Sequence, residues 1–166
     1  PATTLLYRGT KTPEGASIKA SCSNPVYNGK VYTPSNNNGW NYNGYWFDQN
    51  IRMLRYSDVL LMYAEALVNG ASVPITCGLS ADNALNEVRN RAGLGNITGA
   101  TQQNIWDERR AELAMEEDRF FDLIRTNQAA AALTDKGFTV GKHEHYPIPA
   151  AQIQLNPNLT QNNGYN

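Results

Sequence analysis

Cysteine and histidine are both scarce in this chain of 166 residues, which contains two of each. Cys22 and Cys77 lie far apart and have no histidine beside them, whereas a structural zinc site needs about four clustered ligands. The two thiols either form a disulfide or are unrelated buried side chains, and the sequence leaves both open. His143 and His145 have no evident third ligand. We therefore expect them in a solvated loop, with no metal site and no cofactor.

An excess of charge of one sign is also missing, because 14 basic and 15 acidic residues give a net charge of −1. Surfaces that bind nucleic acid or anionic membranes usually contain clustered Lys and Arg. The sequence has no such block, so we expect neither partner. Its apolar run from Val59 to Val68 is about half the roughly 20 residues that span a bilayer. This run is therefore not a transmembrane helix.

Two stretches have the periodicity of helices that pack against each other. Arg52–Val68 is apolar from Val59 onward except at Glu65, so we expect it to be buried on most sides and to end at Asn69-Gly70. Ser80 can cap a second helix over Ala81–Ala92. Its inner stripe consists of Ala81, Ala84, Leu85, Val88 and Ala92. Together they predict an αα-hairpin of the tetratricopeptide-like type.

A third stretch, Asn104–Arg125, has no Gly or Pro and predicts one long helix. Half of its 22 residues are charged, and some charges lie on the same stripe as Ile105 and Phe120. Charged groups on an inner face need partners, so we predict buried ion pairs. The residues concerned are Arg109, Glu112, Glu116 and Arg119. The acids could instead be catalytic, but the interleaved arginines favour a structural role.

Residues 1–50 have little helical periodicity and are broken by Gly and Pro. Residues 4–7 and 30–33 could form short strands. Residues 27–47, which we name the ring-rich segment, contain seven aromatic rings and six interleaved Asn residues. Rings and amides together suit a ligand with one apolar face and a hydroxyl rim, as sugars have.

The candidate ligand contacts are concentrated at one place in the ring-rich segment. They are Trp40, Asn41, Tyr42, Asn43, Tyr45 and Trp46. The equally simple alternative is that these rings cover the helices while the Asn residues form turns. Loops carry function more often than frameworks do, so we keep the ligand interpretation as a hypothesis.

The sequence thus predicts a mainly α fold within one domain spanning residues 1–166. A loop-rich part covers residues 1–50, a helical framework covers 51–128, and a loop with an extended tail covers 129–166. In this tail, Pro149 is placed to begin a short helical turn.

Four segments together resemble one protein family. They are RMLRYSDVLLMYAEAL (52–67), ALNEVRNRAGL (84–94), ERRAELAMEEDRFFDLIR (108–125) and YPIPAAQIQLNPNLTQNNGY (146–165). In this order they are similar to the C-terminal region of the SusD/RagB family, surface lipoproteins of Bacteroidetes nutrient-uptake systems. Members are about three times longer, so the resemblance implies that an N-terminal part of the same protein is absent from this chain.

The resemblance implies a mostly α-helical fold with tetratricopeptide-like hairpins, and an outward-facing position on the outer membrane through an N-terminal lipid. It also implies a glycan as the ligand, a SusC-like TonB-dependent transporter as the partner, and no catalysis. The matching motifs are framework in the family, so no binding residue is transferred from it.

Two functions other than glycan capture are also compatible with the sequence. A helical-repeat member of the same uptake machinery could bind peptide or protein, which a concave helical face lined with rings would favour. A glycosidase would need two carboxylates roughly 5–10 Å apart. Asp48 and Glu144 are the isolated candidates, and neither has an evident partner. We rank this third possibility last.

Overall fold

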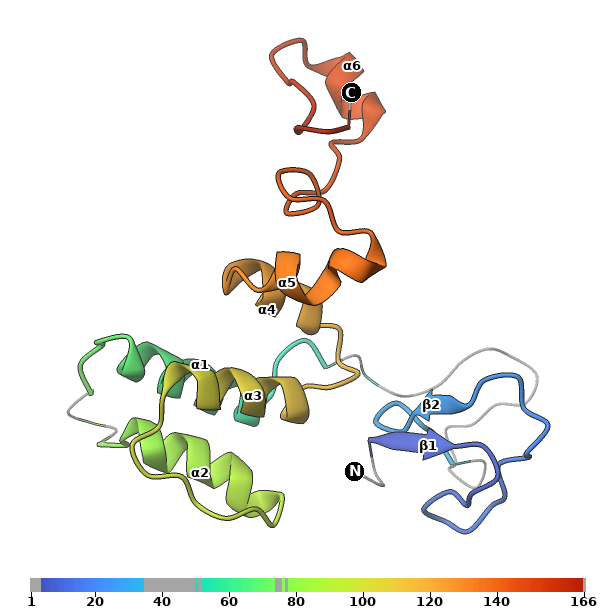
Figure 1. The fold of residues 1–166 in the computed structure, drawn as a ribbon, viewed down its shortest axis with the longest axis vertical. Helices are drawn as coiled ribbons and strands as arrows, with labels where there is room; N and C mark the ends of the chain where they lie inside the picture. Colours follow the sequence, from blue (N-terminus) through green and yellow to red (C-terminus); the bar gives the residue numbers. More distant parts are fainter. Residues whose placement is uncertain (1–3, 35–49, 51, 74–75, 77, 166) are drawn as a thin grey trace. The chain divides into compact units, whose positions relative to one another are not determined.

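The computed structural model describes residues 4–34, 50, 52–73, 76 and 78–165. It is mainly helical, as predicted, and divides into a first unit, residues 1–117, and a second unit, residues 118–166. The first unit contains β1 (Leu5–Tyr7), β2 (Val26–Asn28), α1 (Tyr56–Val68), α2 (Ala81–Arg91) and α3 (Gln102–Glu112) (Figure 1). The second unit contains α4 (Arg119–Arg125), α5 (Ala129–Leu133), a 3₁₀ turn (Thr134–Lys136) and α6 (Ala150–Leu155). None of the described helices combines the length and apolarity that crossing a membrane requires.

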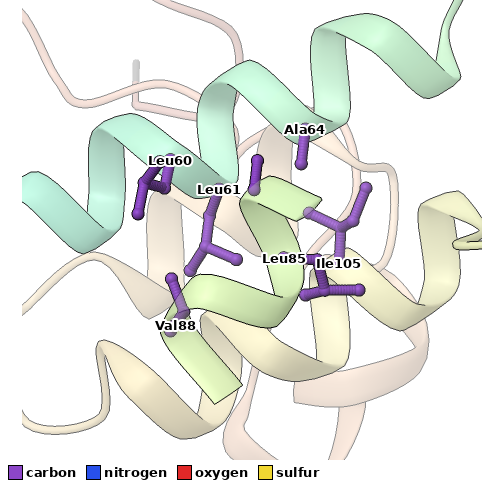
Figure 2. Packing of buried hydrophobic residues seen from close by; sticks show 7 residues of the cluster. Leu60, Leu61, Ala64, Leu85, Val88 and Ile105 are labelled. Carbon is purple, nitrogen blue, oxygen red and sulfur yellow. The ribbon is translucent and has the colours of Figure 1, made fainter. Parts of the chain in front are cut away.

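The hydrophobic core of the first unit lies where α1, α2 and α3 meet (Figure 2). Leu61, Leu85 and Ile105 are completely buried, and each comes from a different helix. Ala64 and Ala84 are also completely buried, and such small side chains let helices approach closely. The predicted αα-hairpin of α1 and α2 is therefore confirmed, and α3 packs against both of its helices.

The beginning and the outer face of α1 differ from the prediction. The helix begins at Tyr56 rather than Arg52, because Arg55 has an extended backbone with φ −143° and ψ 163°. Val59 and Met62 are each 43% exposed, so α1 is buried on one side rather than on most sides. They lie on a different helical face from the core residues that α2 and α3 cover. The predicted end of the helix is confirmed, because Gly70 follows it with φ 95°.

The second helix of the hairpin begins and ends as predicted. Ser80 accepts a hydrogen bond from the backbone N–H of Asn83 at 3.1 Å, and Gly93 follows the helix with φ 73°. The loop beyond α2 returns to the helix at Asn86. The side-chain amide of Asn86 donates to the Ile97 carbonyl and accepts from the Ile97 N–H, both at 2.8 Å.

One part of the fold prediction, the single helix over residues 104–125, is wrong. Helix α3 ends at Glu112, and α4 begins at Arg119. Between them, Met115 and Glu117 have φ values of 68° and 71°, which a right-handed helix does not contain. The periodicity could not reveal this break, because no Gly or Pro marks it.

The first unit also contains a small antiparallel sheet formed by β1 and β2. Leu5 lies opposite Asn28 and Tyr7 lies opposite Val26. The strand predicted at residues 4–7 is confirmed, whereas residues 30–33 are not a strand and the second strand is Val26–Asn28. Beyond Asn28 the chain leaves the sheet, and the Lys30 side chain binds at the end of α3.

The second unit is held largely by amide side chains that bond to backbone. Gln161 accepts from the Ile148 N–H and donates to the Ile148 carbonyl, both at 2.8 Å. Asn162 donates to the Tyr146 carbonyl at 2.6 Å. Pro149 immediately precedes α6, which confirms the predicted helical turn.

Candidate functional site

The six residues predicted to contact a ligand lie outside the described residues. They are Trp40, Asn41, Tyr42, Asn43, Tyr45 and Trp46. The structure does describe the chain on both sides of them, up to Pro34 and again from Arg52. We therefore build the site from these two flanks.

One carboxylate, that of Glu116, binds a cation from each flank. Lys30 Nζ lies 2.5 Å from Oε1 of Glu116, and Arg55 Nε lies 2.7 Å from Oε2. Arg55 Nη2 also donates to Oε1 at 3.0 Å, so its guanidinium makes a two-point contact. The chain that leaves at Lys30 and returns at Arg55 is thus held at a single side chain, which is only 16% exposed.

The C-terminal end of α3 offers further acceptors to the same two cations. The last carbonyls of a helix lack partners within the helix and carry partial negative charge. The backbone carbonyl of Glu112 accepts from Lys30 Nζ at 2.5 Å and from Arg55 Nη2 at 2.7 Å. The Glu112 carboxylate binds Arg55 and Arg91, each at 2.6 Å. We name Lys30, Arg55, Glu112 and Glu116 the charged cluster.

The backbone around Glu116 is shaped to bring its carboxylate into this cluster. Met115 and Glu117, the residues on either side, are both left-handed, which costs a non-glycine residue roughly 1–2 kcal/mol. Asn28 supports the turn, because its amide donates to the Met115 carbonyl at 2.8 Å and accepts from the Lys30 N–H at 2.9 Å. The contacts of the cluster offset the strain of the turn.

Within the cluster, burial and the neighbouring cations shift the pKa values of the two carboxyl groups in opposite directions. Desolvation raises the pKa of Glu116, but hydrogen bonds from Arg55 and Lys30 lower it by more, so the pKa lies below its usual 4.5. The pKa of Glu112 is lowered in the same way: desolvation raises it, while Arg55 and Arg91 lower it by more. Desolvation lowers the pKa of Arg55, but both carboxylates raise it by more. These carboxylates are therefore ionised at neutral pH and suit holding the chain rather than transferring protons.

Arg109, Glu112 and Glu116 do form ion pairs, but with residues outside the predicted set of four. Arg109 Nη1 binds Asp58 Oδ1 in the first turn of α1 at 2.6 Å, with side chains only 7% and 12% exposed. Glu112 and Glu116 bind cations of the charged cluster. Arg119 is half-buried in α4, on the other side of the break. The predicted pairs assumed one unbroken helix, in which residues three or four positions apart lie on the same face. The turn at residues 113–118 interrupts that helical spacing.

The other candidates for chemistry are placed as follows. His143 is half-buried rather than fully solvated, and its Nδ1 accepts from the Thr139 N–H at 2.8 Å. Within the described ranges, no group of three or more His, Cys, Asp or Glu is placed to hold a metal. Backbone hydrogen bonds lower the pKa of Glu144, whereas a general acid needs a raised pKa. Asp48 and Cys77 lie outside the described residues.

Sequence reasoning missed Lys30 and Arg55 as partners of the acids. Lys30 lies 86 positions from Glu116 and Arg55 lies 61 positions from it. Rules for charge pairing along a helix cover residues three or four apart, so they carry no information on such pairs.

Comparison with known proteins places this fold and sequence in one family. The profile of the SusD family matches residues 5–165. The starch-binding protein SusD of Bacteroides thetaiotaomicron is 31% identical over 130 residues, which cover 71% of this chain and 22% of that protein.

Solved structures agree with the sequence comparison. A laminarin binding SusD-like protein is 41% identical, with a TM-score of 0.63 over 72% of this chain and 24% of its own. Surface glycan-binding protein A from Bacteroides uniformis is 28% identical, with a TM-score of 0.69 over 96% of this chain and 36% of its own. The chain spans about a quarter of the length of the curated relatives it matches.

Proposed function

The chain belongs to the SusD family, and on that premise we propose that it is part of a non-catalytic surface protein that captures a glycan. The protein delivers the captured oligosaccharide or polysaccharide to a SusC-like, TonB-dependent transporter. It faces outward on the outer membrane and is held there by a lipid at the N-terminus of the full-length protein.

One observation carries this proposal: proteins similar to this chain in both sequence and structure are named for glycan binding. The relative at 41% identity is described as laminarin binding, and the match over 96% of the chain is described as a surface glycan-binding protein. A third relative is described as starch-binding. A glucan is therefore the first ligand to test.

Within this function, the ring-rich segment contacts the glycan through Trp40, Tyr42, Tyr45 and Trp46. Tryptophan and tyrosine rings stack on the apolar face of a sugar, and Asn41 and Asn43 can bond to its hydroxyl groups. The geometry of the flanks supports this assignment. Lys30 and Arg55 bind the same carboxylate on the helical framework, so both ends of the intervening chain are anchored.

The electrostatics of the described acids support capture without hydrolysis. The carboxylates that cluster are paired with Lys or Arg, and the pKa values of Glu112 and Glu116 are lowered. A glycosidase needs one carboxyl group whose pKa is raised so that it can donate a proton. Release of reducing ends from a polysaccharide by the wild type, but not by Asp48→Asn or Glu144→Gln, would contradict a purely binding role.

The proposed ligand contacts predict a separation between affinity and stability. Trp40→Ala and Trp46→Ala should each weaken binding of laminarin or starch about tenfold, because a stacked ring contributes about 1 kcal/mol beyond its buried area. Affinity electrophoresis or calorimetry measures the binding, and thermal unfolding measures the stability. We expect the melting temperatures of both variants to stay close to that of the wild type.

Trp106→Phe is the matched control, since Trp106 is the third tryptophan of the chain and belongs to the framework. Its indole N–H donates to Glu65 at 2.8 Å, so this change should affect stability rather than affinity. Lower melting temperatures and unaltered affinity in the Trp40 and Trp46 variants would overturn their assignment as ligand contacts. A wild-type protein that binds no glycan of a broad array would overturn the proposed function itself.

Delivery to the transporter is tested separately from binding. The full-length protein should co-purify with a TonB-dependent transporter from detergent-solubilised outer membranes. Recovery of the protein without any such transporter would limit its role to glycan capture.

A further inference from the structure

The second unit contains an open pocket of about 270 Å³ whose walls are mainly aromatic. Four of its lining residues are Phe120, Phe138, Tyr146 and Tyr165. Phe120 and Tyr146 meet edge to face, with ring centroids 6.4 Å apart. Phe138 lies 5.8 Å from the ring of His143, which also lines the pocket. These rings offer flat apolar surfaces to a small ligand.

Polar atoms on the same walls have unused hydrogen-bonding capacity. His143 Nδ1 accepts from the Thr139 N–H, so in the neutral ring Nε2 carries the proton and can donate. The imidazole of His145 and the hydroxyl of Tyr146 form no hydrogen bond with any residue that the structure describes. The pocket therefore combines ring faces with polar groups that a ligand could satisfy.

The cations near the pocket are already engaged by other groups. Lys136, which lines the pocket, pairs with Asp135 at 2.6 Å. Lys142 Nζ lies 4.9 Å from the centroid of the Tyr165 ring. The Lys136–Asp135 pair is largely exposed, so it binds weakly, but Asp135 balances the charge of Lys136 and the lining has no excess of positive charge. A neutral ligand with hydroxyl groups suits such a lining.

We propose that this pocket is a second carbohydrate subsite, which takes one neutral sugar residue and is lined by residues other than Trp40–Trp46. Its volume lies just below the roughly 300 Å³ at which pockets for drug-sized ligands begin, so it fits one ring rather than an extended chain. The choice of sugar as the ligand class rests on the proposed function. Two separate contacts on one chain would raise the avidity for a polysaccharide that reaches both.

The two histidines allow a direct test, because they are the only ones in the chain and both line the pocket. In protein labelled with ¹³C at histidine, two ring signals report on the pocket alone. We expect laminarin oligosaccharides or methyl glucosides to shift both signals saturably. If neither signal responds to a panel of neutral and acidic sugars at tens of millimolar, the inference is overturned. A response to acidic sugars alone overturns the preference for a neutral ligand.

Substitutions test whether the rings of the pocket bind the sugar, as opposed to a neighbouring ring or the Trp40–Trp46 residues. Tyr146→Ala should weaken the response about threefold to tenfold, the usual contribution of one stacked ring. The control is Phe121→Ala, which removes an exposed ring that contacts Phe120 but does not line the pocket. Trp40→Ala should leave the histidine response unchanged. A Tyr146→Ala variant that keeps the full response but loses stability would show that the ring is structural.

A polysaccharide that binds through Trp40 while the histidine signals stay silent refutes the subsite but keeps the proposed function. Histidine shifts with small sugars in a protein that binds no polysaccharide support the subsite and contradict the proposed function. The subsite and the proposed function are therefore refuted by different measurements.

Discussion

The first unit buries aliphatic side chains from three helices, whereas Leu123 and Ala129 are the only apolar residues buried in the described part of the second unit. Their polar contacts differ as well. In the first unit, charged side chains join distant segments, as Arg109 joins Asp58. In the second unit, the amides of Gln161 and Asn162 bond to backbone groups 13 to 16 positions away.

The difference follows from what each stretch of chain can bury. Three helices of 11 to 13 residues converge on one core, while the helices of the second unit have five to seven residues. A small unit buries too little apolar surface for a strong core, so hydrogen bonds of roughly 1 kcal/mol each carry more of its stability. We therefore expect the second unit to open locally at lower cost than the first.

The largest expected effect concerns the ion pairs of the two units. Arg109→Ala leaves the carboxylate of Asp58 buried without its cation and should lower the free energy of unfolding by about 3–5 kcal/mol. Lys136→Ala is the contrasting change in the second unit, where the side chains of Lys136 and its partner Asp135 are 70% and 71% exposed. That change should cost less than about 1 kcal/mol. Equal losses in urea denaturation would remove the contrast between the two units.

A smaller effect is expected from the amide of Gln161. Gln161→Ala removes both bonds to Ile148 and a 2.9 Å bond from the Asn162 N–H, so we expect a loss of about 2 kcal/mol. Hydrogen exchange should accelerate at residues 146–162 and stay unchanged in α1. The exposed Gln154→Ala is the control and should change neither. Faster exchange in α1 as well would show that the two units unfold together.

The smallest expected effect is the change with pH in the stability that the charged cluster contributes. The folded-state pKa values of Glu112 and Glu116 lie below 4.5, so in acid the unfolded chain binds more protons than the folded one. The stability that the charged cluster contributes is complete above about pH 4.5 and is lost as the pH falls through the folded values. Glu116→Gln lacks part of this contribution. Its deficit relative to the wild type, measured by urea denaturation at pH 7 and at pH 3, should therefore shrink in acid.

A deficit that grows in acid, or stays constant, would show that the Glu116 carboxylate is not held by Lys30 and Arg55. Asp107→Asn provides a control, because Asp107 lies on an exposed part of α3 and bonds only to its neighbour Gln103 among the described residues. It should show little dependence on pH.

Much of the helical framework could be predicted from local sequence. The Ser80 cap, the Gly70 and Gly93 stops and the start of α6 after Pro149 all depend on residues within one or two turns. The break between α3 and α4 could not be predicted in this way. Met115 and Glu117 are ordinary helix residues, and their left-handed conformation exists because distant groups compensate for it.

The candidate ligand-binding residues likewise include a part that the sequence predicted and a part that it did not. Composition alone identified the rings and amides at Trp40–Trp46, and this assignment stays a prediction because those residues lie outside the described part of the chain. The pocket in the second unit was not found from the sequence. Its lining comes from residues 120 to 165, and only the turns between them bring Phe120 beside Tyr146.

The sequence by itself determined that the two hairpin helices exist, that Ala84, Leu85 and Val88 face inward, and which family the chain belongs to. Periodicity, caps and motifs depend on neighbouring residues. Only the tertiary structure decided that Lys30 and Arg55 share Glu116, and that Arg109 binds Asp58 in another helix. A charged side chain specifies the sign of its partner but not the partner's position along the chain. That choice is made when helices pack and the buried charges must each find an opposite charge within reach.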